Sequence, residues 1–225
     1  HITDGAALDA AFADLAPAVV INCAAFHNVD ECEREQRQAW IVNVEAVRAL
    51  AERCRAAGAR LVHYSTNYVF DGRREEPYGE DDVPSPRSVY AITKLAGEHA
   101  ALAYCPDALV IRGSGLYGRA GNRSKGGNFV QRMLARAREQ GALRMVADQR
   151  LTPTYTPDLA AATAEAVERG AGGVLHVTNG GACSWYEFTQ AILAGAGLAG
   201  VPVEAVSTTL GPGTADRPLN GVLVS

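Results

Sequence analysis

Tyr90 and Lys94 are the two residues whose types and spacing most directly suggest chemistry. They stand four positions apart in the segment VYAITKLAGEH, so a helix would place both side chains on one face. A free tyrosine titrates near ~10 and is a poor proton donor or acceptor at neutral pH. A lysine ammonium within reach favours the phenolate and lowers the tyrosine pKa toward the range of acid–base catalysis. Because exposed amphipathic pairs share this spacing, the motif needs support from its surroundings.

A second group of polar side chains comes upstream, at the end of a predicted strand. The segment RLVHYST at Arg60–Thr66 is followed by NYVFDG. Open α/β sheets bind their ligands at the carboxyl ends of parallel strands. There, the Thr66 hydroxyl can donate a hydrogen bond to a substrate carbonyl while Tyr90 protonates it. Ser65 competes for this role, but strand alternation turns it to the other face and favours Thr66.

The order of the strands and helices that position these residues predicts an α/β fold with a doubly wound parallel sheet. Ala18–Ala25 is short, apolar and rich in β-branched residues, which is typical of a strand buried on both faces. Strands that alternate with helices of about 10 or more residues are joined as parallel neighbours by right-handed crossovers. The further elements that we expect are helix Gln36–Ala57, strand Arg60–Thr66, helix Ser88–Tyr104, strand Ala108–Ser114, helix Asn128–Gln140, strand Leu143–Ala147, helix Pro157–Arg169, strand Gly173–Thr178 and helix Trp185–Ala194.

The distribution of glycine and loops predicts two parts. We expect residues 1–118 to form a partial dinucleotide-binding domain. Residues 119–225 are expected to form mainly a smaller substrate-binding lobe, with some elements returning to the main sheet. A dinucleotide-binding sheet normally opens with a strand, a Gly-rich turn and a helix that holds the pyrophosphate. No such turn lies near His1, so we expect a Rossmann-like fold whose first βαβ segment is missing from this sequence.

Composition and charge argue against several other classes of protein. The net charge of −4 does not provide the clustered basic face that nucleic acid requires. The short basic segment Arg119–Lys125 contains glycine, and we interpret it as a mobile loop. No apolar run reaches the ~18 to 20 residues needed to span a bilayer. The five cysteines are scattered without C-x-x-C spacing, which predicts neither a zinc site nor disulfides and favours a reducing cytoplasm.

Several motifs together resemble the extended short-chain dehydrogenase/reductase superfamily. HYSTNYVFDG followed by YAITKLAGE is most similar there to the dTDP-4-dehydrorhamnose reductase family, which has S-T-D-Y-V-F-D-G and then Y-x-x-x-K-L-x-G-E. VVINCAAFHNVDECE, GNFVQRML, VADQRLTPTYTPDLA and DRPLNGVLVS also follow that family. The resemblance extends over the whole sequence.

The resemblance implies a reductase and assigns roles to individual residues. Such an enzyme transfers a hydride from NADPH or NADH to the 4-keto group of a nucleotide-activated 6-deoxysugar, as in dTDP-L-rhamnose synthesis. Tyr90 would donate the proton, and Thr66 would polarise the carbonyl. Lys94 would lower the pKa of Tyr90 and contact the nicotinamide ribose. The cofactor would also contact Ala25, Phe26, His27 and Tyr64, and the substrate would contact Thr66, Asn67, Gly115 and Asn128.

Two of these positions depart from the family pattern. Asn67 replaces an aspartate, and Gly115 stands where the family has a tryptophan that contacts the sugar. Loss of an aromatic platform removes contact worth on the order of 1 kcal/mol, so we expect a more open sugar pocket. Asn128 is also a good helix N-cap, which would explain it without a ligand.

Two other functions of the same fold stay open. One is a non-catalytic regulatory subunit of another enzyme, and the other is a sugar-nucleotide epimerase. The combination of Thr66, Tyr90 and Lys94 favours catalysis, since a scaffold has no physical need for all three. VFDG and the DQ-x-x-T-P-T segment favour a reductase over an epimerase. The sequence therefore predicts a cytoplasmic enzyme that can form a homodimer, with a nucleotide-sugar substrate and no nucleic-acid, membrane or metal partner.

Overall fold

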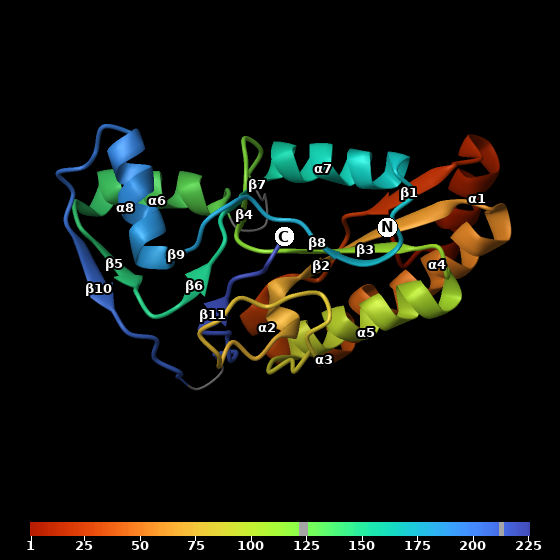
Figure 1. Cartoon of the computed structure of the whole chain (residues 1–225), viewed down its shortest axis with the longest axis horizontal. Coiled ribbons are helices and arrows are strands. Elements are labelled where there is room, and N and C mark those ends of the chain that lie inside the picture. Colours follow the sequence, from red (N-terminus) through yellow and green to blue (C-terminus); the bar gives the residue numbers. More distant parts are fainter. Residues whose placement is uncertain (122–125, 212–213) are drawn as a thin grey trace.

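The computed structural model describes residues 1–121, 126–211 and 214–225. Residues 122–125 of the basic segment Arg119–Lys125 lie outside the described residues, so our interpretation of that segment stays a prediction. The main sheet has four parallel strands in the order β1-β2-β3-β8 (Figure 1). These strands are Val19–Asn22, Arg60–Thr66, Leu109–Gly113 and Gly173–His176.

Helices cover both faces of this sheet. On one face α1 (Gly5–Leu15), α4 (Ala46–Ala57) and α5 (Val89–Tyr104) share a core with Leu61 and Val110. On the other, α7 (Thr156–Glu168) packs on Val62, Leu109 and Ile111. Since neighbouring residues of a strand face opposite sides, the sheet is buried on both faces along β2 and β3. The predicted doubly wound α/β fold is confirmed.

Strand β1 differs from its prediction. Among the described strands it lies at the edge of the sheet and pairs with β2 alone. Val19 is 37% exposed and Ile21 is 52% exposed, because the described helices cover only its other face. The expectation of a strand buried on both faces was therefore wrong for the described part of the chain.

The predicted helix Gln36–Ala57 is continuous but not uniform. It consists of α3 (Gln36–Trp40), a π-helical turn at Ile41–Glu45, and α4, which ends at Gly58. The Ala46 N–H bonds to the Ile41 carbonyl, which inserts one extra residue into the turn. Such π turns often occur at functional sites, and this one carries the fully buried Asn43.

A second group of elements, on the left in Figure 1, has its own core. Helices α6 (Phe129–Gln140) and α8 (Trp185–Gly195) pack against the parallel pair β5 (Leu143–Val146) and β10 (Val203–Val206). Met133, Leu143 and Leu193 lie at its centre. Between the chain segments of this group, α7 and β8 return to the main sheet.

Short elements join the two groups. They are α2 (Val29–Arg34), the 3-10 turn η2 (Asn67–Val69), the parallel pair β4 (Leu116–Tyr117) and β7 (Thr154–Tyr155), and a small sheet of β6 (Arg150–Leu151), β9 (Cys183–Ser184) and β11 (Asn220–Gly221). Within the described ranges, no helix is both long enough and apolar enough to cross a membrane.

Candidate active site

The end of β2 and the start of α5 bring Thr66 and Tyr90 together. Strand β2 ends at Thr66, and α5 begins one residue after Ser88, whose hydroxyl accepts the Ala91 N–H at 3.3 Å. This N-cap orients the first turn of the helix, on which Tyr90 lies. The Thr66 side chain lies close enough to the Tyr90 hydroxyl to lower the pKa of that tyrosine.

Burial raises the pKa of the Tyr90 hydroxyl, while the nearby Thr66 side chain lowers it to a smaller extent. Tyr68 also raises this pKa, and its ring meets that of Tyr90 edge-to-face at a centroid distance of 5.8 Å. Tyr90 is therefore protonated at neutral pH and can donate a proton, as a general acid must.

Lys94 lies one turn further along α5, with only 2% of its surface exposed. Its Nζ donates a hydrogen bond of 2.6 Å to the backbone carbonyl of Tyr64. Burial lowers the pKa of Lys94 to about 8, against the opposing effect of Glu98. The amine thus exchanges its proton near physiological pH, unlike an exposed lysine.

Sequence reasoning missed a pair of residues behind Lys94. His63 is fully buried, and its Nε2 lies 3.3 Å from Lys94 Nζ. Asn22 Nδ2 lies 3.0 Å from His63 Nδ1. The signal that could have found His63 is the two-residue alternation of β2, which turns it and Ser65 to the same face.

The Ser65 side chain does not point to Tyr90 but forms a hydrogen bond with Glu98. Its hydroxyl donates to the Glu98 carboxylate, which also pairs with Arg112 at 2.7 Å. Glu98 and Arg112 are 2% and 3% exposed, so this is a buried ion pair under the site. Thr66, at the carboxyl end of β2, therefore provides the hydroxyl group that lies near Tyr90.

The predicted cofactor loop Ala25–His27 follows β1 and is half-buried. Asn43 holds it: Oδ1 accepts the Phe26 N–H at 2.8 Å, and Nδ2 donates to the Phe26 carbonyl at 3.0 Å. The same Nδ2 also donates to Thr93 Oγ1 on α5. This loop is thereby tied to the helix that carries Tyr90 and Lys94. The fourth residue of the predicted cofactor set, Tyr64, bonds through its hydroxyl to Thr163 on the opposite face, at 2.8 Å.

Two residues that were predicted to contact substrate, Asn67 and Asn128, form hydrogen bonds within the protein. Asn67 Oδ1 accepts from the Thr66 hydroxyl at 3.3 Å, and its Nδ2 donates to the Gly221 carbonyl at 2.9 Å. Asn128 caps α6 in a reciprocal capping box with Gln131, and its Nδ2 donates to the Gly118 carbonyl. Their roles toward substrate stay predictions.

Gly115 is closely surrounded by the segment around Leu151. Its φ is +58°, and an added Cβ would lie 2.5 Å from Leu151 Cδ1 and 2.9 Å from the Thr152 carbonyl oxygen. The space beside the glycine is filled by Leu151, and the expectation of a more open sugar pocket stays a prediction. Whether Gly115 contacts substrate stays a prediction.

A cavity of about 350 Å³ lies between Tyr68, whose ring contacts Tyr90, and the second group of elements. Its walls include Tyr68, Phe129, Trp185, Leu210 and Arg217. The rings of Phe129 and Trp185 pack with centroids 4.5 Å apart. Both rings line the cavity.

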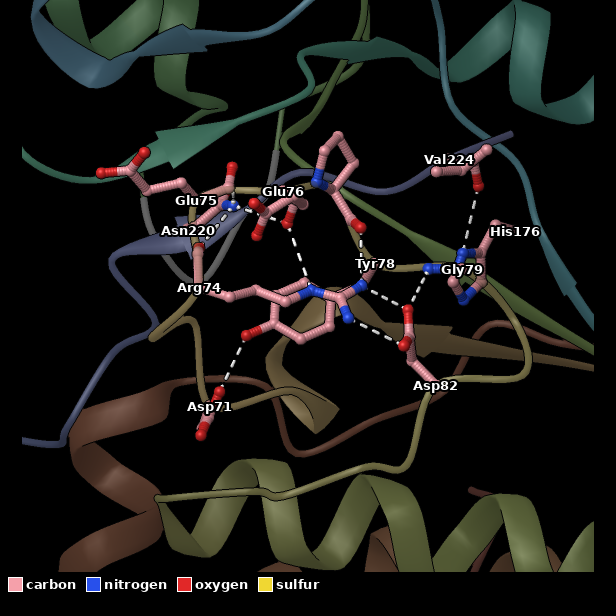
Figure 2. A network of polar contacts seen from close by, with 11 residues as sticks. Asp71, Arg74, Glu75, Glu76, Tyr78, Gly79, Asp82, His176, Asn220 and Val224 are labelled. Atoms are coloured by element: carbon pink, nitrogen blue, oxygen red, sulfur yellow. Dashed lines mark hydrogen bonds and ion pairs between the residues drawn. The ribbon is translucent and has the colours of Figure 1, made fainter.

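The loop that joins β2 to α5 is held by a polar network, shown in Figure 2. Asn220 Nδ2 donates to three successive carbonyl oxygens of this loop, those of Arg74, Glu75 and Glu76, at 2.9, 3.0 and 3.1 Å. Arg74 also pairs with Asp82 within the loop. A residue far along the chain thus fixes the connection between Thr66 and Tyr90.

Comparison with known proteins agrees with this geometry. The family model described as RmlD substrate binding domain matches residues 1–225. A dTDP-4-dehydrorhamnose reductase of Streptomyces griseus is 45% identical over 190 residues, covering 82% of this chain and 61% of that protein. A probable dTDP-4,6-dihydroxy-2-methyloxan-3-one 4-ketoreductase of Streptomyces antibioticus is 43% identical, covering 85% of this chain and 64% of that protein. The chain thus spans somewhat less than two thirds of the length of these relatives.

Solved structures give the same family. The crystal structure of a dTDP-4-dehydrorhamnose reductase from Bacillus anthracis in complex with NADP superposes with a TM-score of 0.91 at 34% identity, covering 99% of this chain and 77% of that one. The corresponding enzyme from Clostridium acetobutylicum gives a TM-score of 0.92 at 37% identity, with coverage of 99% and 77%. The chain therefore belongs to the RmlD substrate binding domain family, and the resemblance to dTDP-4-dehydrorhamnose reductases is confirmed.

Proposed function

We propose that this protein is a reductase that uses NADPH or NADH to reduce the 4-keto group of a nucleotide-activated 6-deoxysugar. The observation that carries the proposal is the meeting of Thr66 and Tyr90 one helical turn from the buried Lys94. Relatives named as ketoreductases and dTDP-4-dehydrorhamnose reductases support the same chemistry.

The donor set fits a nicotinamide cofactor. Lys94 is an ammonium with three N–H donors, of which one is directed to the Tyr64 carbonyl, so a ribose hydroxyl can accept from another. Ala25, Phe26 and His27 follow the carboxyl end of β1, the edge at which such sheets bind dinucleotides. We propose that these residues, with Tyr64 and Tyr90, hold the cofactor, which supplies the hydride when bound.

Each residue of the triad has a distinct role in the proposed reaction. The Thr66 hydroxyl, which donates to Asn67 Oδ1 at 3.3 Å, turns its O–H to the substrate carbonyl oxygen, and this hydrogen bond polarises and orients the carbonyl. Tyr90 then gives its phenolic proton to that oxygen as negative charge develops there. Lys94 stabilises the resulting phenolate, because its ammonium lies on the same helix face one turn away.

The substrate is proposed to occupy the cavity beside Tyr68. Phe129 and Trp185 provide apolar faces for a base or sugar ring, and Arg217 provides a cation suited to a diphosphate. This assignment agrees with a division into a dinucleotide-binding part, residues 1–118, and a mainly substrate-binding part, residues 119–225. The separate core around Met133 and Leu193 supports that division.

The remaining parts of the proposal concern location and assembly. We propose a cytoplasmic protein, which is compatible with its five free cysteines. Sedimentation of the full-length protein would distinguish a monomer from the proposed homodimer.

The test is NADPH and NADH oxidation by the full-length protein with a panel of nucleotide 4-keto sugars. Tyr90→Phe should lower kcat by ~100- to 10,000-fold while cofactor binding survives. Lys94→Met should lower both kcat and cofactor affinity, and Thr66→Val should raise the barrier by only ~1 to 3 kcal/mol. Tyr104→Phe, on the exposed end of the same helix, is the matched control. Near-normal turnover by Tyr90→Phe would refute the mechanism and favour the regulatory-subunit alternative.

A further inference from the structure

The hydroxyl of Thr66 must hold one orientation if it is to meet a substrate carbonyl together with Tyr90. Thr66 is the N-cap of the 3-10 turn η2, and its Oγ1 accepts the Tyr68 backbone N–H at 3.2 Å. A hydroxyl has one hydrogen and two lone pairs, so this contact occupies a lone pair and leaves the O–H for another partner. That partner is Asn67 Oδ1, at 3.3 Å.

The other end of the Asn67 amide is anchored on strand β11. Asn67 is 5% exposed, and its Nδ2 donates to the Gly221 carbonyl at 2.9 Å. A carbonyl oxygen can only accept a hydrogen bond, so Nδ2 must face Gly221 and Oδ1 must face Thr66. A residue 154 positions later in the chain thereby determines the orientation of the amide.

Gly221 provides the space that this anchor needs. A Cβ added at residue 221 would overlap with Asn67 Nδ2 and lie 3.3 Å from the Arg150 carbonyl oxygen. Any side chain at this position would therefore displace the amide. The Gly221 carbonyl also accepts from Ser114 Oγ at 2.9 Å, so two side chains hold this carbonyl in place.

We propose that Asn67 is a positioning residue that holds the Thr66 hydroxyl in the orientation needed for the reaction, and that its pairing with Gly221 is required for this role. The inference rests on the proposed function, because Thr66 acts there on the substrate carbonyl. Asn67 contributes to the reaction through Thr66.

The length of the contact between Thr66 and Asn67 suits an exchange of partners. An O–H···O hydrogen bond is typically about 2.7 to 2.8 Å long, so the contact of 3.3 Å is weak. A neutral amide oxygen is also a weaker acceptor than a carboxylate. The hydroxyl hydrogen can therefore turn to a substrate carbonyl, while the Tyr68 N–H keeps the hydroxyl oxygen in place.

The first test is the side-chain conformation of Thr66 in the full-length protein without substrate. Three-bond couplings of the carbon-13-labelled threonine methyl group, assigned by its loss in Thr66→Val, should report a single χ1 rotamer. Asn67→Leu keeps a side chain of similar size without hydrogen bonds and should give couplings averaged over several rotamers. Gly221→Ala should do the same independently, because its Cβ displaces the amide. A single rotamer in both variants would overturn the inference.

Two variants are matched controls. Ser114→Ala removes the other side-chain hydrogen bond to the Gly221 carbonyl and should leave the Thr66 rotamer and kcat unchanged. Gly172→Ala places its Cβ 3.8 Å from the nearest atom, the Ala108 carbonyl oxygen, and is the control for Gly221→Ala. If Ser114→Ala averaged the Thr66 couplings as strongly as Asn67→Leu, the docking of β11 would orient Thr66, and the proposal would be wrong.

The second test is a double-mutant cycle in steady-state kinetics. Asn67→Leu should lower kcat by about 3- to 10-fold with little change in KM for the sugar nucleotide. In the Thr66→Val background the same substitution should lower kcat no further, because the hydroxyl through which Asn67 acts is already absent. An equal loss of kcat in both backgrounds would refute the inference.

The two tests separate this inference from the proposed function. If the protein oxidises neither NADPH nor NADH but the Thr66 rotamer responds to Asn67→Leu and Gly221→Ala, the reductase assignment fails and the positioning of Thr66 by Asn67 stands. Normal reductase activity with an unchanged Thr66 rotamer in both variants would have the opposite meaning.

Discussion

Arg217 Nη2 lies 2.7 Å from the carboxylate of Asp30, a residue 187 positions away in the sequence. Asp30 also accepts the Ala215 backbone N–H at 3.0 Å. Arg217 further interacts with Tyr68, whose ring contacts Tyr90 edge-to-face. The pair therefore attaches a segment near residue 216 to helix α2 beside the candidate site.

This pair should make stability depend on pH in the acidic range. The hydrogen bond from Arg217 lowers the pKa of Asp30 below its ordinary value of 3.8. The contribution is thus fully present above pH 3.8 and disappears as the pH falls through the folded-state pKa. Both side chains are partly exposed, so solvent screening limits the effect to less than about 1 kcal/mol. Urea unfolding between pH 2 and 6 should show a smaller acid-induced loss of stability in Arg217→Gln than in the parent protein. Arg144→Gln, which breaks an exposed pair with Glu204, is the control. Parallel pH profiles for the parent protein and Arg217→Gln would contradict the prediction.

Lys94 should affect stability in the alkaline range. Its pKa falls from 10.5 in the free group to about 8 in the fold, so the unfolded chain binds the proton more tightly. The free energy of unfolding should therefore rise between pH 8 and 10.5, by roughly 3 kcal/mol from this group. Lys94→Met should lack this rise, as measured by urea unfolding at successive pH values. An equal rise in both proteins would exclude Lys94 as its source.

The buried pair of Glu98 and Arg112 should be costly to break. Arg112 Nη1 has no hydrogen-bond partner among the described residues, so the guanidinium depends on Glu98 for its compensation. Glu98→Gln should destabilise the fold by about 3 to 5 kcal/mol, because it leaves a buried charge unpaired. The double variant with methionine at both positions should recover much of that loss in chemical unfolding. If its cost equals the sum of the two single methionine variants, the two charges are not coupled.

Gly115 should resist substitution because of both its backbone and its surroundings. Gly115→Ala introduces a Cβ 2.5 Å from Leu151 Cδ1 at a φ of +58°. Gly58→Ala is a matched control, since its φ is +67° and no atom lies within 4 Å of the added Cβ. Placing an alanine at a positive φ costs roughly 1 kcal/mol in both variants. At Gly115 the close contact with Leu151 should add about 1 to 3 kcal/mol. Equal losses of thermal stability in the two variants would show that Leu151 gives way freely.

The sequence predicted the elements whose signals are local. Strand β2 was predicted with the bounds that the structure has, and α5 and α6 begin next to their N-cap residues Ser88 and Asn128. These features depend on strand alternation and on side chains that bond within three residues. The approach of Tyr90 to Thr66 followed from the rule that strand ends and crossover helices meet at one sheet edge.

Other features depend on partners distant in the sequence and were not predicted. The exposure of β1, the π turn and the filling of space at Gly115 by Leu151 all arise from tertiary packing. The contacts of His63 with Asn22 and Lys94 were not predicted, because its neighbours in the sequence give no sign of either partner. Asn67 and Asn128 were predicted to bind substrate from a resemblance, but a motif does not reveal that both amides are occupied by the backbone.

The network around Asn220 has a consequence for the order of folding. Its amide bonds to carbonyl groups 144 to 146 residues earlier in the chain, so the β2–α5 connection is completed by contacts of very long sequence separation. Such contacts form slowly, since a large loop must close before they contribute. During synthesis, β2 and α5 can pair and collapse well before Asn220 leaves the ribosome. Thr66 and Tyr90 would then reach their final registration among the last events of maturation, after the sheet itself has assembled.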